Sequence, residues 1–319
     1  MQDYKKHPNK YKEKPCLPCY RKRGSEFYLC YTNQSCKIKY GKIVLSKSLS
    51  IGIPQYEKYQ DLIKDFNQVR IKPLNKGYKV EIIYEVKDTE TSKGRREKVS
   101  SIDLGIDNLV TLVSEDFAYL FSGEFIKSYN KLFNKTLAKL NSIKDLQKIK
   151  GTTKRIKKLY YDRELYIEDV FHKISRKIVD LLINSEVTKL IVGYNKGWKQ
   201  GVNMGKRNNQ KFTQIPFARL ISYMEYKCKL AGIEIVTHEE SYTSKCDSLA
   251  FEAIGKHENY LGKRKKRGLY QSSTGKLINA DVNGALNIMR KVVGDSCGSI
   301  QRIIDRGLLF NPVRIKSVF

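Results

Sequence analysis

The sequence lacks several features that mark familiar classes of protein. No apolar run approaches the ~20 residues that a membrane-spanning helix needs, and the N-terminal segment, MQDYKKHPNKYKEKP, has no hydrophobic stretch typical of a signal peptide. We therefore expect a cytoplasmic protein with no membrane partner, whose seven cysteines stay reduced. Tryptophan occurs once, but 21 Tyr and 12 Phe supply material for a core and for stacking.

Acidic residues are also scarce. The chain has 33 Asp and Glu against 61 Lys and Arg, which gives a formal net charge of +28. A charge of this size repels itself unless an anionic partner binds, and a polyphosphate backbone is the usual partner. A lysine-rich surface without such a partner is the alternative. The charge favours nucleic-acid binding and by itself indicates no chemistry.

The cysteines do not make a convincing zinc site. Cys16 and Cys19 form a CxxC motif, but Cys30 and Cys36 follow with a spacing of five residues. Cys30 also falls within an apolar, strand-like segment, FYLCYT. We therefore do not expect zinc.

The character of the sequence changes along its length. We predict, in chain order, a basic extended arm over residues 1–26, a β-rich domain over 27–99, an α/β domain over 100–292 and a C-terminal tail over 293–319. The β signal is clearest in YKVEIIYEV, where apolar and aromatic residues alternate with polar ones at period two. The segment KIVLSKSLSIGI predicts two more short strands. Together they favour a small antiparallel barrel or sheet.

The α/β domain has a recognisable order of elements. SSIDLGIDNLVTLVS predicts a β-hairpin, and FAYLF predicts a third strand beside it. Residues 125–183 predict a helical insertion, interrupted by the basic run GTTKRIKKLYYDR. Strands KLIVGY and IEIVTHEE then alternate with helices over 215–232 and 280–293, and a basic insertion occupies 246–278. This order predicts a mixed sheet covered by helices.

Two aspartates stand out from these elements. Asp103 lies among apolar residues on a strand, where a carboxylate is costly unless something pairs with it. It could instead cap the turn at Gly105, although Asp107 is better placed to do so. Asp281 opens a helix, where Asn279 and Asp281 are both ordinary N-cap residues. Taken singly, each aspartate would more often be structural than functional.

The sequence segments around the two aspartates are more informative. IDLGIDNLVTL and, far downstream, NADVNGALNIMRK resemble the first and third RuvC motifs of the TnpB (OrfB) family, the RNA-guided nucleases of insertion sequences. HKISRKIVD, YNKGWKQ, NNQKFTQIPF and ESYTSK extend the resemblance from about Tyr31 to Arg290. The family is related to type V CRISPR effectors and to the eukaryotic Fanzor proteins.

The resemblance implies an RNase H-like RuvC domain that follows a β-rich wedge domain, a guide RNA from the transposon end and a double-stranded DNA target. It further implies an endonuclease that uses two Mg²⁺ ions, with Asp103 bridging the ions and Asp281 binding one of them. The alternative is a catalytically inactive or degenerate RNA- and DNA-binding relative. A transposase, the family's historical label, is a weaker alternative.

The chain departs from the family pattern at the expected second acidic residue. A Glu should end the strand KLIVGY, but Gly193 stands there. Glu239 and Glu240 end the next predicted strand and precede a Tyr-Thr-Ser sequence, an arrangement that resembles relocated glutamates in some relatives. We predict Asp103, Glu240 and Asp281 as catalytic metal ligands, with Glu239 as the alternate to Glu240. Two solvated acids at a strand end are the structural alternative.

Two further departures concern zinc and length. Family members usually carry two CxxC motifs before the final Asp, whereas this chain has only Cys246 there. Only about 30 residues precede YTNQ, so we expect an N-terminally truncated member. We make no prediction about self-association. The residues predicted to contact nucleic acid are Lys196, Trp198, Lys199, Lys206 and Arg207 in one loop, and Lys263, Arg264, Lys265, Lys266 and Arg267 in the basic insertion.

Overall fold

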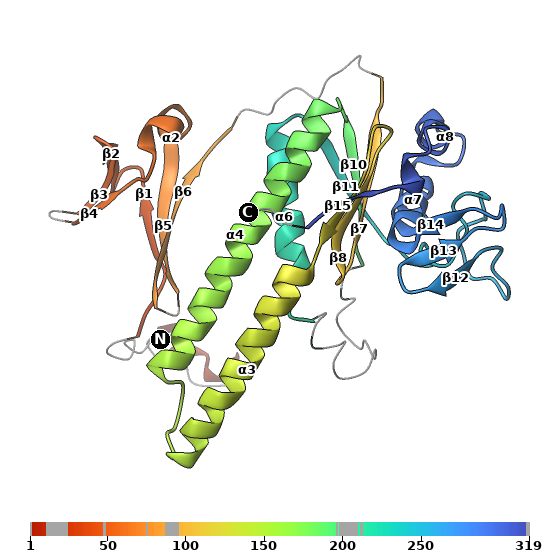
Figure 1. Ribbon diagram of the computed structural model, residues 1–319. Helices are drawn as coiled ribbons and strands as arrows, with labels where there is room; N and C mark the ends of the chain where they lie inside the picture. Colours follow the sequence, from red (N-terminus) through yellow and green to blue (C-terminus); the bar gives the residue numbers. More distant parts are fainter. Residues whose placement is uncertain are drawn as a thin grey trace. The chain divides into compact units, whose positions relative to one another are not determined.

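The chain forms two compact units, residues 1–85 and 86–319 (Figure 1). The computed structural model describes residues 2–10, 25–46, 49–74, 76–86, 96–195, 197, 210 and 213–316. The predicted boundary between the β-rich and α/β domains, at residue 99, lies in the second unit, because β7 (Val99–Leu104) is a strand of that unit's sheet. Cys16 and Cys19 lie outside the described residues.

The first unit contains two three-stranded antiparallel sheets. One has the order β1-β5-β6, formed by Leu29–Thr32, Phe66–Leu74 and Gly77–Tyr84, and the other has the order β2-β3-β4, formed by Lys37–Lys39, Lys42–Ser46 and Leu49–Gly52. Helix α2 (Tyr56–Ile63) connects them, and Ile43, Val69 and Ile71 are among the core residues. The predicted strands are present, but the described residues do not close into a barrel.

The N-terminal residues differ from the predicted extended arm. Gln2–Lys6 form helix α1, and Pro8–Lys10 form a 3₁₀ turn, η1. Lys5 and Lys6 lie in the last turn of α1, where cations interact favourably with the negative end of the helix dipole. Proline is favoured at the start of a helical turn because its missing N–H would have no partner there. Polar, basic composition alone could not distinguish these short helices from an extended arm.

The second unit is built on a six-stranded mixed sheet of order β11-β10-β7-β8-β9-β15. Strands β7, β8 (Asn108–Val113) and β9 (Ala118–Ser122) form an antiparallel meander. Strands β10 (Lys189–Gly193) and β11 (Glu234–His238) add in parallel beside β7. An antiparallel meander extended by parallel strands from its first member is the RNase H-like arrangement, so the predicted α/β fold is confirmed.

Helices cover both faces of this sheet (Figure 1). Helices α3 (Glu124–Leu146), α4 (Lys154–Asn184) and α6 (Phe217–Leu230) pack on one face, and α7 (Ala280–Val293) packs on the other. The predicted interruption of the helical insertion is wrong over 154–163, because α4 runs through that segment unbroken. Thr153 caps α4 by accepting a hydrogen bond from the amide of Ile156 at 3.3 Å, and the basic side chains that follow favour a helix.

The basic insertion forms a small antiparallel sheet of β12 (Lys263–Lys266), β13 (Leu269–Gln271) and β14 (Leu277–Asn279). Asp247 is fully buried beneath it and accepts hydrogen bonds from the side chains of Ser272 and Ser273 at 2.8 and 3.0 Å. Tyr270 packs into the same core as α7. Hydrogen bonds to a buried carboxylate thus tie this insertion to the domain.

Residues 293–319, predicted to be a tail, are part of the domain over most of their length. They form α8 (Gly298–Asp305), a 3₁₀ turn η2 (Leu308–Phe310) and β15 (Val313–Ile315), which pairs in parallel with β9. Ile300 and Ile303 are buried in the α7 core. The spacing of these two residues is a helical signal that the prediction of a tail overlooked.

A buried ion pair anchors α8 to the sheet. Glu115 is 2% exposed and accepts two hydrogen bonds from Arg302 at 2.9 Å and one from Ser299 at 2.6 Å. Arg96 adds a fourth at 2.8 Å. Although burial opposes ionisation, these donors lower the pKa of Glu115 from 4.5 to about 2. The carboxylate therefore stabilises the folded state while it is charged.

We expect Glu115→Gln to lower the free energy of unfolding by about 3 kcal/mol at pH 7, as measured by urea denaturation. Because folding lowers the pKa of Glu115, its contribution is complete above pH 4.5 and declines as the pH falls towards 2. The difference between wild type and variant should shrink over that interval. Glu97→Gln, at an exposed ion pair with Lys189, should change little at any pH. A pH-independent difference would contradict the assigned role of Glu115.

Candidate functional site

Asp103 faces α7 because of the alternation of side chains along β7. Ile102 and Leu104 are buried in the core under α3, α4 and α6, so Ser101 and Asp103 point to the opposite face. Ser101 donates a hydrogen bond to the carbonyl of Ala285 at 2.7 Å, which confirms that this face meets α7. A Cβ added at Gly284 would lie 2.8 Å from Asp103 Oδ2. The absence of a side chain at position 284 thus lets α7 approach the carboxylate.

Asp281 lies in the first turn of α7. Asn279 is the N-cap, and its side chain accepts hydrogen bonds from the amides of Asp281 and Val282 at 2.9 and 3.3 Å. The Asp281 carboxylate is therefore not needed as the cap, and its Oδ2 accepts a hydrogen bond from Asn108 Nδ2 at 2.7 Å. Of the two capping candidates in the sequence, Asn279 has the structural role.

Glu240 follows β11 and reaches the end of the neighbouring strand. Its amide donates to the side-chain oxygen of Asn195 at 2.9 Å, which fixes the backbone where the two strands end. A Cβ added at Gly193 would lie 2.9 Å from Glu240 Oε2 and 2.4 Å from Ile288 Cδ1. The Glu240 carboxylate thus lies where a side chain at position 193 would begin.

The electrostatics show that the three carboxylates are near one another. The pKa of Asp103 is raised well above its ordinary value, first by burial and then by the negative charges of Glu240 and Asp281. The charge of Arg264 and the backbone amide of Leu104 act in the opposite direction. Burial raises the pKa of Glu240 to about 7. Such a cluster of carboxylates is costly without a cation and is typical of functional sites.

The oxygen atoms of this cluster fit a hard divalent cation. Among the described residues, Glu240 Oε2, Asn108 Oδ1 and Thr111 Oγ1 are buried and have no hydrogen-bond partner. Thr111 lies directly opposite Asp103 in the β7–β8 pairing, so both side chains are on the α7 face. Buried oxygens without a donor call for a water molecule or an ion, and Mg²⁺ prefers oxygen ligands.

The carboxylates are not in a closed coordination shell. Within the described part of the chain, no three Asp, Glu, His or Cys side chains are grouped closely enough to enclose a metal ion as they stand. Like charges at this site repel one another, so the side chains would have to draw together around a bound cation. Residues Asp103, Asp281 and Glu240 can therefore supply ligands, but their final geometry depends on the ion.

The other predicted site residues fall into three groups. Glu239 is exposed and accepts a hydrogen bond from Ser241, outside the carboxylate cluster. The predicted loop contacts Lys196, Trp198, Lys199, Lys206 and Arg207 lie outside the described residues. Residues 263–266 form the fully exposed strand β12, and Arg267 pairs with Asp107.

The structure adds residues that the sequence did not single out. Asn108 orients Asp281, Asn195 fixes the backbone of Glu240, and Gly284 leaves room for Asp103. Asn108 sits in the predicted hairpin next to Asp107, so an uncharged polar residue entering a buried strand was the available signal. Asn195 and Gly284 give no such signal, because their roles depend on contacts between distant segments.

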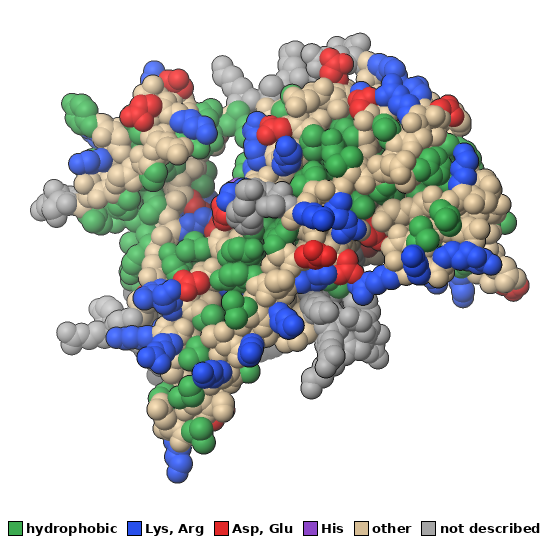
Figure 2. Space-filling model, in the orientation of Figure 1, with side chains coloured by type: hydrophobic (Ala, Val, Ile, Leu, Met, Phe, Trp, Pro, Cys, Tyr) green, Lys and Arg blue, Asp and Glu red, His purple; other side chains and the backbone are tan. Residues whose placement is uncertain are grey.

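The surface around this domain is basic. Lys and Arg dominate the charged side chains on the face of the molecule drawn in Figure 2. No helix in the described ranges is both long enough and apolar enough to cross a membrane.

Comparisons with known proteins identify relatives for both parts of the α/β domain. Residues 81–199 match the OrfB_IS605 family, described as a probable transposase, and residues 217–288 match the TNB domain of Cas12f1-like proteins. The TnpB-like protein ORF457 of Acidianus two-tailed virus is 27% identical over 237 residues, which are 71% of this chain and 49% of the viral protein. The chain thus spans about half the length of that curated relative.

Two solved structures are also similar. One is a Cas12f1–sgRNA–target DNA complex, with a TM-score of 0.45 and 19% identity over 83% of this chain and 67% of that one. The other is a CRISPR-Cas12f ternary complex, with a TM-score of 0.45 and 17% identity over 89% of this chain and 66% of that one. Both family matches lie on the RNase H-like domain and its basic insertion, and together with the viral relative they support membership of the TnpB (OrfB) family.

Proposed function

We propose that this protein is an RNA-guided, Mg²⁺-dependent DNA endonuclease with a RuvC-type centre. The observation that carries the proposal is the gathering of Asp103 and Glu240 at α7, whose first turn carries Asp281, with a buried Glu240 oxygen that has no hydrogen-bond partner among the described residues. A buried oxygen without a donor calls for a water molecule or an ion, and the three neighbouring carboxylates favour a cation.

The residues of the site then have two kinds of task, metal binding and the positioning of the ligands. Asp103, Glu240 and Asp281 would hold the metal, while Asn108 orients Asp281 and Asn195 holds the backbone of Glu240. Bound Mg²⁺ would supply a basic water molecule and neutralise the charge on the leaving oxygen. Binding requires the carboxylates to be deprotonated, so bound positive ions would offset the burial and the repulsion that otherwise raise the pKa of Asp103.

The basic surface supports nucleic acid as the substrate. Strand β12 exposes four basic side chains to solvent, those of Lys263, Arg264, Lys265 and Lys266. The positive charge of Arg264 acts to lower the pKa of Asp103. Such side chains contact backbone phosphates without reading sequence. In the TnpB resemblance, sequence is read by a guide RNA derived from the transposon end and the target is double-stranded DNA. We propose the same partners here.

The test is plasmid cleavage by protein purified with its co-expressed RNA. We expect double-strand cleavage in Mg²⁺, loss of cleavage in EDTA and recovery when Mg²⁺ is restored. Gly193, which stands where the family pattern places a glutamate, favours a second function, binding without cleavage. Recovery of a specific RNA with the wild type, without cleavage at any Mg²⁺ concentration, would support that second function and contradict the first.

A further inference from the structure

A pocket of about 610 Å³, lined by residues with polar side chains, lies beside α3 and outside the carboxylate cluster. Its volume falls within the roughly 300–1,000 Å³ that is usual for small-ligand sites. The lining comes from two segments: the first three turns of α3, and the residues just before α6. The side chains used in the argument below are Lys127, Asn130, Lys131, Asn134, Gln210 and Gln214.

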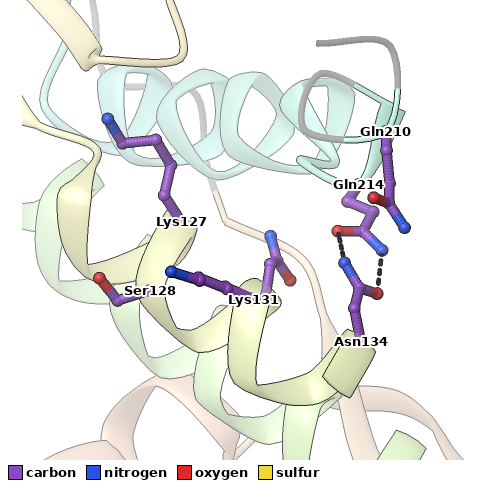
Figure 3. A pocket seen from close by; sticks show the side chains of 7 residues that line it. Lys127, Ser128, Lys131, Asn134, Gln210 and Gln214 are labelled. Atoms are coloured by element: carbon purple, nitrogen blue, oxygen red, sulfur yellow. Dashed lines mark hydrogen bonds between the residues drawn. The ribbon is translucent and has the colours of Figure 1, made fainter. Parts of the chain in front are cut away.

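The lining is divided by chemistry. Figure 3 shows the ammonium groups of Lys127 and Lys131 on one side, and the amides of Asn134, Gln210 and Gln214 on the other. Lysine is a point charge suited to phosphate, whereas Asn and Gln amides match the donor and acceptor edges of nucleobases. A nucleotide has the same division, with an anionic phosphate at one end and a planar polar base at the other.

The amide side is held in place and still has unused hydrogen-bonding capacity. Asn134 and Gln214 donate to each other at 3.1 and 2.7 Å, and this pair uses one N–H and one lone pair of each amide (Figure 3). Each amide therefore keeps a second N–H and a second lone pair. Arg163 braces this side by donating to Asn130 Oδ1 at 2.8 Å and to the backbone carbonyl of Gln214 at 2.7 Å.

The turn between β7 and β8 connects the pocket to the carboxylate cluster. Lys127 forms an ion pair with Asp107, and the next residue, Asn108, donates to Asp281 at 2.7 Å. Asp107 also pairs with Arg267 at the end of the basic strand β12. Asp107 thus contacts both the pocket and the end of β12, and its neighbour Asn108 contacts the cluster, so a nucleic-acid strand bound along β12 would come close to both sites.

From these contacts we propose that the α3 pocket binds one unpaired nucleotide of the substrate strand, close to the phosphodiester that is cleaved. The phosphate lies at Lys127 and Lys131, and the base meets the amides of Asn134, Gln210 and Gln214. The nucleotide is unpaired because a paired base has its hydrogen-bonding edge occupied. The pocket thereby positions a single strand across the carboxylates. This inference rests on the proposed nuclease function only for its role in cleavage; binding itself does not require cleavage.

The first test compares two charge reversals on the same helix. Lys131 and Lys139 are both exposed on α3, but only Lys131 lines the pocket. In EDTA, Lys131→Glu should weaken the binding of short single-stranded oligonucleotides about tenfold, whereas Lys139→Glu should weaken it less than about threefold. DNA and RNA oligonucleotides measured in parallel show which sugar the pocket prefers. Equal losses in the two variants would overturn the proposal, because non-specific attraction would then account for both.

The second test locates the base directly. Oligonucleotides containing 4-thiothymidine or 4-thiouridine are photocrosslinked to the full-length protein in EDTA, and the modified peptides are identified by mass spectrometry. We expect crosslinks within residues 127–134 or at Gln214, which are lost in Asn134→Leu/Gln214→Leu but retained in Asp103→Asn. Thermal melting shows whether the double variant folds, and Lys131→Glu remains the test if it does not. Crosslinks confined to other segments would exclude the pocket, whether or not the wild type cleaves DNA.

Discussion

Asp103→Asn is expected to abolish DNA cleavage, with a loss of about a thousandfold or more, and to leave the binding of RNA and single-stranded DNA unchanged. A thousandfold loss corresponds to about 4 kcal/mol of transition-state stabilisation. The reason is that the charges of both Glu240 and Asp281 act on Asp103, so its carboxylate lies near both of the other proposed ligands. Asparagine keeps the size of the side chain but removes the charge that would hold the metal.

The same substitution should make the metal-free protein more stable. A carboxyl group whose pKa is raised by folding destabilises the fold once the pH exceeds its ordinary value, 3.8 for Asp103, and ceases to do so when it is protonated in both states. The melting temperature in EDTA should therefore be higher for Asp103→Asn than for the wild type at pH 7, and the difference should vanish in acid. Relief of about 1 kcal/mol corresponds to roughly 2–4 °C in a domain of this size.

Adding Mg²⁺ provides the control for this interpretation. Because a ligand stabilises the state that binds it, Mg²⁺ should raise the melting temperature of the wild type and have little effect on Asp103→Asn. Equal shifts in the two proteins would place the ion elsewhere. An Asp103→Asn variant that cleaves at the wild-type rate would contradict the proposed centre even if its stability changed as expected.

The sequence was sufficient to predict the strand that carries Asp103 and the helix that carries Asp281. Alternation along β7 and the helical spacing in α7 are local signals, and the structure contains both the strand and the helix that they predict. The helical start of α4 at Lys154 was missed because a run of lysines was interpreted as a loop. On an exposed helix such a run is favourable, since long basic side chains lose little freedom there.

Contacts between distant segments could not be predicted in the same way. The pairing of Asn108 with Asp281 joins residues 173 positions apart, and the contact of Gly284 with Asp103 has a similar separation. Neither leaves a periodic pattern in the sequence. The α3 pocket was missed for the same reason, because its amides become neighbours only when the segment before α6 packs against α3.

Glu240→Gln is expected to reduce cleavage by about a hundredfold or more, whereas Glu239→Gln should change it less than about twofold. The two residues are adjacent and chemically identical, so they form a matched pair. Glu240 has a buried oxygen that fits a metal, but Glu239 is exposed and bonded to Ser241. Loss of one of a few carboxylate ligands weakens both metal binding and the activation of water. The measurement is the single-turnover rate at saturating Mg²⁺.

Moving the carboxylate to position 193 tests why Glu240 is needed. A Cβ at Gly193 would lie 2.9 Å from Glu240 Oε2 and 2.4 Å from Ile288 Cδ1, so a side chain there would displace both atoms from their present positions. The exchange Gly193→Glu/Glu240→Gly therefore needs Ile288→Val, which removes the Cδ1 atom at a cost of about 0.5–1.5 kcal/mol. We expect this triple variant to cleave at least about tenfold faster than Glu240→Gly/Ile288→Val. If the two are equally inactive while the triple variant stays folded, the carboxylates at 193 and 240 are not interchangeable. Recovery of cleavage would show that one position in space beneath α7 must carry a negative charge, whichever strand supplies it.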